Sequence, residues 1–293
     1  MGKYISVDIG GTEIKYGLLS EEGVFLWHGS TPTEAARGGC CLMEKVGKII
    51  GSLMCGGIAG ICISTAGMVD SVQGKILYAN SNIPGYVGTE VKKRLEEAFH
   101  IPCEVENDVY CAGMAEYGSG AAAGSRLALC LTVGTGIGGC LLADGQVLRG
   151  AGYSAGSVGY LHMPDGRSFE ESGSVTALVR RVAERKREDA ALWDGRKIFD
   201  GIAGRDGICI GAVDEMADIL GLGIADICYL FNPEVVVLGG GIMRQEEYLL
   251  PRIRASLDRY LIPAVASRTR LRAAVHRNEA GMLGAFYHFK DRQ

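Results

Sequence analysis

The sequence lacks the features that mark several classes of protein. Its 293 residues include 30 lysines and arginines against 34 acidic residues, so there is no positive surplus to displace counterions from a nucleic acid. No apolar run is long enough to span a bilayer, and the first residues lack the apolar core of a secretory leader. We therefore expect neither a nucleic acid nor a membrane as a partner.

The ten cysteines include no CxxC pair, the spacing typical of thiolate metal sites and redox centres. Most have apolar neighbours, as in Ile61-Cys62-Ile63. Such positions are typical of small core residues in a reducing compartment. The protein is therefore expected to be cytoplasmic.

Two common nucleotide-binding motifs are absent or out of context. The sequence has no GxxxxGK followed by Ser or Thr, which excludes a P-loop enzyme. Gly134-x-Gly136-x-x-Gly139 fits the dinucleotide fingerprint formally, but that fingerprint requires a helix directly after it. Residues 140–143 read as a strand instead, which disfavours hydride transfer on a nicotinamide cofactor.

Strands alternate with helices along the chain, a pattern that predicts an α/β fold. The length exceeds one typical domain and favours two lobes around a cleft. Thr89 is the expected N-cap of one helix. The predicted strands are 4–7, 14–19, 58–64, 75–78, 103–106, 127–133, 140–143, 235–238 and 271–274, and the predicted helices are 41–53, 89–99, 109–117, 174–187, 211–231, 245–260 and 279–289.

Three glycine-rich turns each follow an apolar strand: residues 10–12, 134–139 and 239–241. Glycine lets backbone N–H groups approach and surround phosphate oxygens. Tight hairpins that bind nothing are the alternative interpretation of any one of these turns. The opening strand–turn–strand recurs at 127–143, which indicates a duplicated fold with one glycine turn at the mouth of a shared cleft in each half.

Four segments, Asp8-Ile-Gly-Gly-Thr-Glu-Ile-Lys15, Glu106-Asn107-Asp108, 131–139 and 233–242, resemble a known family in order and spacing. They are similar to the DxGGTxxK phosphate turn, the catalytic segment, the second phosphate turn and the adenosine-side turn of the ROK family (repressors, open reading frames and sugar kinases). This family belongs to the actin-like ATPase superfamily. The chain most resembles its beta-glucoside kinase-like members that lack zinc.

The resemblance implies two ribonuclease-H-like α/β lobes with an interlobe cleft, a small lobe of residues 1–112 plus 279–293 and a large lobe of 113–278. It implies a glucokinase-like, ATP- and Mg²⁺-dependent kinase that phosphorylates a primary (6-type) hydroxyl of a hexose, an N-acylhexosamine or a beta-glucoside. A homodimer is implied as well. The family's repressors carry a DNA-binding segment before the first motif, whereas seven residues precede Asp8 here, so we expect no DNA reader.

The resemblance also implies roles for single residues. Asp108 would be the general base, Asn107 and Asn82 would bind sugar hydroxyls, and Asp8 would hold Mg²⁺ through water. The expected nucleotide-binding residues are Asp8, Gly10, Gly11, Thr12, Lys15, Gly134, Thr135, Gly136, Gly239, Gly240 and Gly241. From the residues alone, Asp108 could instead be a helix N-cap, and Lys15 could be an exposed strand residue.

The sequence departs from the family downstream of the second phosphate turn. The family's ExGH is replaced by Ser157-Val158-Gly159-Tyr160, and Tyr160 is similar to a variant in beta-glucoside kinases, which favours a beta-glucoside or a neutral hexose. The family's zinc cysteines are missing from 164–169, so no zinc site is expected. Glu170 would face the anomeric end of the sugar, or Glu171 if the register shifts by one. The changed sugar residues leave a second hypothesis, a non-catalytic sugar-sensing ROK protein without a DNA-binding domain.

Overall fold

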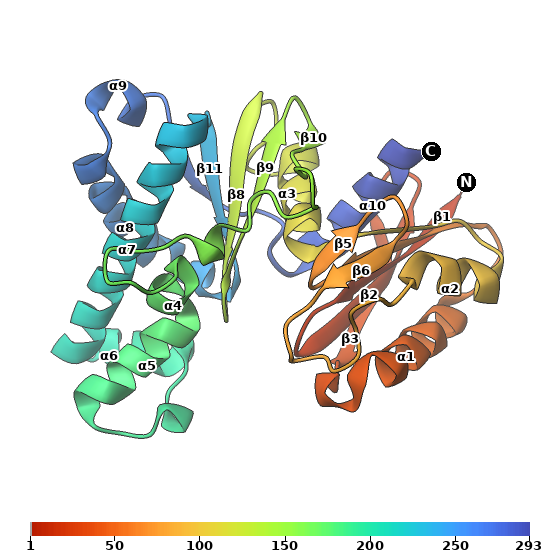
Figure 1. Cartoon of the computed structure of the whole chain (residues 1–293), viewed down its shortest axis with the longest axis horizontal. Helices are drawn as coiled ribbons and strands as arrows, with labels where there is room; N and C mark the ends of the chain where they lie inside the picture. The colour runs from red at the N-terminus through yellow and green to blue at the C-terminus, as the bar shows by residue number, and fades with distance from the viewer. Residues whose placement is uncertain (1) are drawn as a thin grey trace. The chain divides into compact units, whose positions relative to one another are not determined.

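The computed structural model describes residues 2–293 and divides into two compact units, coloured by residue number in Figure 1. The first unit comprises the chain up to Gly120 together with Arg149–Ala155 and Asn278–Gln293. The second comprises Ala121–Leu148 and Gly156–Arg277. The boundary between the units comes directly after helix α3 (Asp108–Ser119). The boundary expected from the motifs, at 112, lies inside this helix. A helix packs as one body, so it stays whole within one unit.

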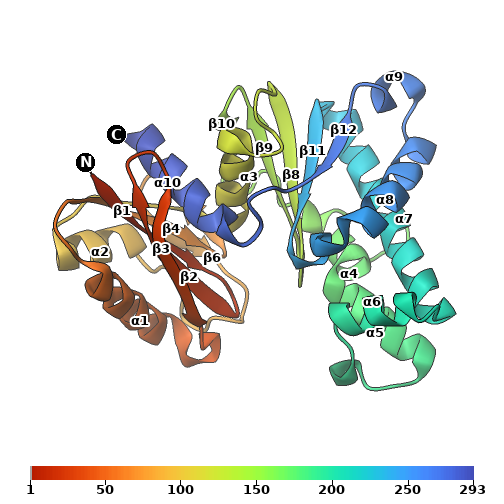
Figure 2. The same cartoon turned by 180° about the vertical axis from the view of Figure 1, so that it is seen from behind.

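The first unit is built on a five-stranded sheet in the order β3-β2-β1-β4-β7. Strands β1, β2 and β3 pair antiparallel, whereas β1, β4 and β7 pair parallel. The alternation of β1 explains how both faces are covered. Ile5, Val7 and Ile9 face the core under α1 and α2, while Tyr4 packs with the core under α3 and α10. Both views show these two pairs of helices on opposite sides of the sheet (Figures 1 and 2).

The second unit repeats this topology with the order β10-β9-β8-β11-β12. Strand β8 pairs antiparallel with β9 and parallel with β11, as β1 does with β2 and β4. Its core joins the inward residues of β8 and β11 to the helices α4 to α8, with Phe169 and Met216 fully buried in it. The α/β class and the duplication inferred from the recurring strand–turn–strand are both confirmed.

The strands are β1 Lys3–Ile9, β2 Glu13–Ser20, β3 Phe25–Pro32, β4 Ile58–Thr65, β5 Met68–Asp70, β6 Lys75–Tyr78, β7 Cys103–Asn107, β8 Leu127–Val133, β9 Ile137–Ala143, β10 Gln146–Val147, β11 Val235–Gly239 and β12 Arg270–Ala273. The helices are α1 Gly38–Leu53, α2 Val91–Phe99, α3 Asp108–Ser119, α4 Phe169–Gly173, α5 Val175–Lys186, α6 Gly195–Ala203, α7 Gly207–Phe231, α8 Glu246–Tyr260, α9 Pro263–Ala266 and α10 Ala280–Arg292.

The prediction that Thr89 is the N-cap of the second helix was wrong. Helix α2 begins at Val91, its N-cap position is Glu90, and no side chain caps it. Thr89 lies before the helix, where its carbonyl accepts a hydrogen bond from the Ile76 N–H and Glu90 forms a bridge with Lys75. The backbone around Thr89 is thus held extended beside β6, and this pairing delays the start of the helix.

Candidate functional site

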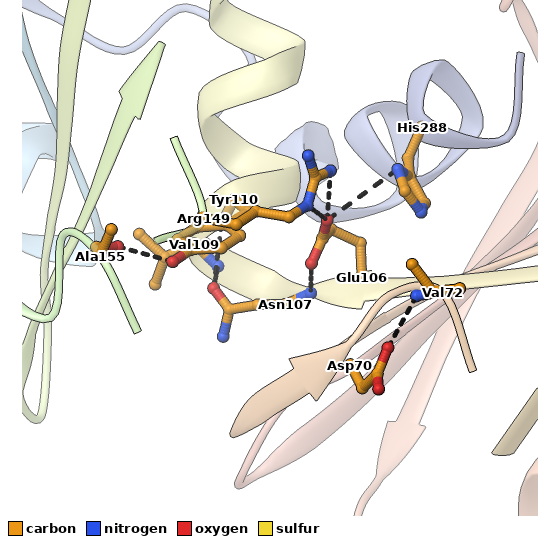
Figure 3. Close-up of polar contacts among 9 residues, drawn as sticks. All are labelled: Asp70, Val72, Glu106, Asn107, Val109, Tyr110, Arg149, Ala155 and His288. Atoms are coloured by element: carbon orange, nitrogen blue, oxygen red, sulfur yellow. Dashed lines mark hydrogen bonds and ion pairs between the residues drawn. The ribbon is translucent and has the colours of Figure 1, made fainter. Parts of the chain in front are cut away.

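The end of β7 and the start of α3 carry the segment Glu106-Asn107-Asp108. Figure 3 shows Glu106 and Asn107 of this segment with their partners. The N-cap of α3 is Asn107, whose side-chain oxygen accepts hydrogen bonds from the N–H groups of Val109 and Tyr110, each at 3.0 Å. The Asn107 amide nitrogen donates to the Gly67 carbonyl at 2.7 Å. The helix is therefore capped by Asn107, which leaves the Asp108 carboxylate available for another role.

Asp108 is partly buried, and one of its carboxylate oxygens accepts hydrogen bonds from the Val109 N–H at 2.9 Å and the Asn107 amide at 3.0 Å. Burial and then the nearby charge of Asp8 raise the pKa of Asp108 to about 7, although these hydrogen bonds oppose the rise. A carboxylate with a pKa near neutrality can accept a proton and return it at the pH of a cell. Asp108 is thus a carboxylate that can exchange a proton near neutral pH.

Asp8 lies in β1 just before the first glycine turn, directly opposite Lys15 of β2 in the antiparallel register. The Ser64 hydroxyl donates to one Asp8 oxygen at 2.6 Å, and the Lys15 ammonium lies 3.8 Å from the other. Burial raises the pKa of Asp8 against both of these partners. The Lys15 side chain is 27% exposed, so it lies beside Asp8 and is not the fully exposed strand residue of the alternative interpretation.

Thr33 fixes the first glycine turn by two hydrogen bonds. The Thr33 hydroxyl donates to the Gly10 carbonyl at 2.7 Å, and the Thr33 N–H donates to the Thr12 carbonyl at 2.8 Å. Gly11 and Thr12 themselves are exposed. The turn is therefore fixed by its carbonyl groups while its tip faces outward.

The second and third glycine turns meet within the second unit. Gly240 has a φ of +97°, and a β-carbon on it would overlap the backbone of Val133. Only glycine therefore fits where the third turn packs against the end of β8. Gly134, Thr135 and Gly241 line one pocket of about 440 Å³. Gly136, Gly239 and Gly240 are not among the residues that line this pocket. Two of the three predicted phosphate turns thus open into one pocket.

Sequence reasoning missed most of the other side chains of this pocket: Asp194, Arg196, Phe199, Arg244 and Gln245. They come from α6 and its N-cap and from the short 3-10 turn before α8. The Phe199 ring packs edge-on against Tyr248, 5.8 Å between centroids. The signal that could have found α6 is the Asp194 cap, which accepts from the Lys197 N–H at 2.8 Å and precedes apolar residues at helical spacing.

The residues expected to bind the sugar are divided between the units. Glu170 accepts a hydrogen bond from the Ile137 N–H at 3.3 Å and so lies against the second glycine turn. Glu171 instead closes a capping box, because its carboxylate accepts from the Ser168 N–H at 2.8 Å. Ser157 starts a 3-10 turn that ends at Tyr160, which is 57% exposed.

In the first unit, Asn107 and Asp108 are hydrogen-bonded to each other, whereas Asn82 lies on the exposed loop between β6 and α2. Within residues 2–293, no group of three or more histidine, cysteine or acidic side chains could hold a metal ion. Over the same residues, no helix combines the length and apolarity needed to cross a membrane.

Comparison with known proteins assigns these features to a family. The sequence matches the ROK family model over residues 4–292. It is 50% identical to an uncharacterized protein of Clostridium perfringens, with 99% of both chains covered. It is 31% identical to a beta-glucoside kinase of Klebsiella pneumoniae, over 98% of this chain and 96% of that one.

A solved structure supports the same assignment. The ROK family glucokinase of Streptomyces griseus, in complex with glucose and AMPPNP, superposes with a TM-score of 0.86 at 28% identity over 97% of this chain and 98% of that one. The chain therefore belongs to the ROK family, and carbohydrate kinase is the enzyme class to which these relatives assign it.

Proposed function

We propose that the protein transfers the γ-phosphate of ATP to a primary (6-type) hydroxyl of a hexose, an N-acylhexosamine or a beta-glucoside, with Asp108 as the general base. The observation that carries this proposal is the environment of Asp108. Its carboxylate is oriented by two hydrogen bonds, and its pKa is raised to about 7. A base tuned to neutral pH is what deprotonation of a sugar hydroxyl requires.

In the proposed step, ionised Asp108 accepts the proton of the sugar hydroxyl as that oxygen attacks the γ-phosphorus. The new oxygen–phosphorus bond forms while the bond to the β,γ-bridging oxygen breaks, and ADP leaves with the electron pair. Asn107 contributes by orientation, because its amide holds Asp108 while its carbonyl oxygen caps α3. We also propose that Asn107 and Asn82 contact hydroxyl groups of the sugar.

The pocket in the second unit supports binding of the nucleotide. Gly134, Thr135 and Gly241 line the pocket, and Arg196 and Arg244, which also line it, supply positive charge. Phosphate oxygens favour backbone N–H groups and arginine. The structure of the Streptomyces griseus glucokinase contains AMPPNP, an ATP analogue. This complex supports our proposal that ATP is the phosphate donor.

Asp8 fits the role of an indirect Mg²⁺ ligand. It offers hard carboxylate oxygens. Burial raises its pKa, and a nearby cation would oppose that rise because it favours the ionised form. No cluster of three acidic, cysteine or histidine side chains accompanies it within residues 2–293. This donor set suits an ion that keeps several waters and binds chiefly to phosphates. When bound, Mg²⁺ would neutralise charge on the β- and γ-phosphates.

Three residues bear on the identity of the sugar. Ser157 and Tyr160 differ from the family pattern, and Glu170 is the carboxylate that lies against the second glycine turn. We propose a beta-glucoside or a neutral hexose, in keeping with Tyr160 and with the beta-glucoside kinase among the relatives.

A screen of ADP release tests the proposal. The protein is incubated with ATP and Mg²⁺ and a panel of hexoses, N-acylhexosamines and beta-glucosides. We expect at least one sugar to stimulate ADP release well above the sugar-free rate. No stimulation by any member of the panel would overturn the kinase proposal.

A sugar-sensing protein without turnover is the second candidate, and the changed residues Ser157 and Tyr160 favour it. The same panel, followed by calorimetry, separates the two functions. A sensor would bind one of the sugars and release no ADP in its presence.

We also propose a cytoplasmic homodimer. All ten cysteines are free thiols, which is typical of a reducing compartment. Exposed apolar side chains lie together at the ends of α7 and α8. The Tyr229 hydroxyl joins the two ends, because it donates a hydrogen bond to the Tyr260 carbonyl and accepts one from the Ile262 N–H. Leu230 beside them is 72% exposed. A second copy covering this patch would give the mass of two chains in light scattering, whereas a single-chain mass would contradict the dimer.

A further inference from the structure

The buried carboxylate of Glu106 joins two parts of the first unit that the proposed reaction leaves unexplained. Its side chain is 0% exposed. One of its oxygens accepts a hydrogen bond from the Asn107 N–H at 2.8 Å. The other accepts two from Arg149, at 3.0 Å from Nε and 2.7 Å from Nη2. Figure 3 shows Arg149 reaching this carboxylate beside Tyr110.

Arg149 begins a short segment, Arg149–Ala155, that belongs to the first unit although the residues on both sides of it in sequence belong to the second. The segment is closed on itself by a hydrogen bond from the Ala155 N–H to the Arg149 carbonyl at 3.1 Å. We call this segment the crossing loop. Its end lies two residues before Ser157, the first of the residues expected to meet the sugar.

The crossing loop has a further attachment to the first unit. The hydroxyl of Tyr110, in the first turn of α3, donates to the Ala155 carbonyl at 2.6 Å. Asp70 of the first unit also raises the pKa of Tyr153 in the loop. Arg149 and Ala155 are therefore fastened, at the two ends of the loop, to the residues on either side of Asn107-Asp108.

Arg149 is the cationic residue that donates hydrogen bonds to the Glu106 carboxylate. His288 of α10 approaches the same oxygen, but its Nδ1 atom is 3.9 Å away, too far for a hydrogen bond. Burial lowers the pKa of His288 to about 3, so its ring is neutral at physiological pH. The attachment of the crossing loop to Glu106 thus depends on the Arg149 guanidinium.

We propose that Glu106 and Arg149 form a positioning pair for the phosphorylation of the sugar. One oxygen of Glu106 orients the peptide of Asn107, which leads to the catalytic Asp108. The other oxygen fixes the crossing loop, which leads to Ser157 and Tyr160. One buried carboxylate therefore sets both the base and the start of the sugar-binding segment. This inference rests on the proposed kinase function.

The planar guanidinium is suited to this task, because its Nε and Nη2 donors reach one oxygen from a fixed fork. A lysine ammonium would supply the charge without the fork. Removing Arg149 would leave Glu106 buried without its cation, and the loop would lose its first attachment. A displacement of reacting groups by about 1 Å can reduce turnover on the order of a hundredfold.

Steady-state kinetics of Arg149→Ala test the inference, with Arg126→Ala as the matched control. Arg126 is 83% exposed and pairs with Asp144 on the surface, so its loss should leave the kinetics unchanged. For R149A we expect the KM for the sugar to rise by about tenfold or more and kcat to fall, while the KM for ATP stays within about twofold. Added guanidinium should restore part of the lost kcat/KM, and ethylammonium should not.

Equal increases in the KM for sugar and for ATP would overturn the inference, as would R149A kinetics that match those of R126A. If R149A fails to fold, Arg149→Lys and Tyr110→Phe provide the same measurement, because each weakens one attachment of the loop. Both should raise the KM for the sugar selectively, and an unchanged KM in both would refute the pair's role. A wild-type protein without activity on any sugar would instead refute the proposed function.

Discussion

The carboxylate of Asp108 experiences two opposing influences. Burial and the charge of Asp8 favour its protonated form, whereas the Val109 N–H and the Asn107 amide favour the ionised form. The balance raises its pKa to about 7, against an ordinary value of 3.8. This difference affects both activity and stability, and the two effects have opposite signs.

Activity should be lost as the pH falls through the pKa of Asp108. In the proposed step the ionised carboxylate is the base, so log kcat/KM should be level above about pH 7 and decline with a slope near one below it. The profile is measured with the free enzyme at low sugar concentration, and bound Mg²⁺ near Asp8 would move the midpoint down. A rate that stays level down to pH 4 would contradict the assignment of Asp108 as the base.

Stability should change in the opposite direction. Because the folded state holds the Asp108 proton more tightly than the unfolded state does, this group's contribution to stability is present below pH 3.8 and is lost as the pH rises towards 7. Asp108→Asn cannot ionise. At pH 8 its melting temperature should exceed that of the wild type by about 2–4 °C per kcal/mol gained. The difference should disappear near pH 4, and a less stable D108N at pH 8 would be the contrary result.

Glu170 and Glu171 are adjacent residues with different expected roles. Glu170→Gln should raise the KM for the sugar about tenfold, since losing a hydrogen bond to a charged group costs roughly 1.5–3 kcal/mol. Glu171→Gln is the control, because its carboxylate closes the capping box of α4. It should lower the melting temperature slightly and leave the KM unchanged. The reverse pattern would place the sugar contact at Glu171.

The sequence alone could single out the β7–α3 junction as a candidate site, but not which of its polar residues caps α3. Asp108 is a good N-cap by residue type, yet Asn107 occupies the cap. The choice depends on Gly67, forty residues away, whose carbonyl orients the Asn107 amide. A partner that distant in sequence leaves no local signal.

Among the elements, α3 and α10 approach most closely where Gly284 of α10 faces Cys111 of α3. A β-carbon at Gly284 would overlap the backbone of Cys111. We expect Gly284→Ala to destabilise the protein by about 1–3 kcal/mol, measured by urea unfolding, because an overpacked helix crossing must shift. Gly47→Ala in α1 is the control, because nothing lies within 4 Å of the added carbon.

The alanine at position 47 should stabilise the protein by about 0.5–1 kcal/mol, the usual gain over glycine inside a helix. A neutral effect of Gly284→Ala would show that α10 can move away from α3 without loss of stability. The catalytic segment would then not depend on a fixed α10.

Most elements could be predicted because their buried faces repeat at the period of a strand or a helix. Strand β3 could not be, since it is an edge strand and its Leu26 and Trp27 are about half exposed. Helix α6 has a cap at Asp194 and apolar residues at helical spacing, but it has only nine residues and one buried side chain, Ile198. Both elements contribute little to the core, so a search for long buried faces passes over them.

At the scale of the whole chain, the repeated sheet topology could be predicted from the recurrence of strand, glycine turn and strand. The pocket that we propose for the nucleotide could be predicted only in part. Its glycine turns have a sequence signature, but Phe199 and Arg244 come from separate segments that only the fold brings together. For the sugar, the sequence indicates only a preference, because Ser157 and Tyr160 depart from the family's ExGH pattern.

The most direct test of the account compares wild-type protein with Asp108→Asn on the best sugar of the panel. Sugar-dependent ADP release and calorimetric sugar affinity are measured on the same preparations. We predict that D108N loses at least about a hundredfold in kcat while its sugar affinity changes by no more than a few-fold. A D108N variant that releases ADP at the wild-type rate would contradict the central claim that Asp108 activates the sugar hydroxyl.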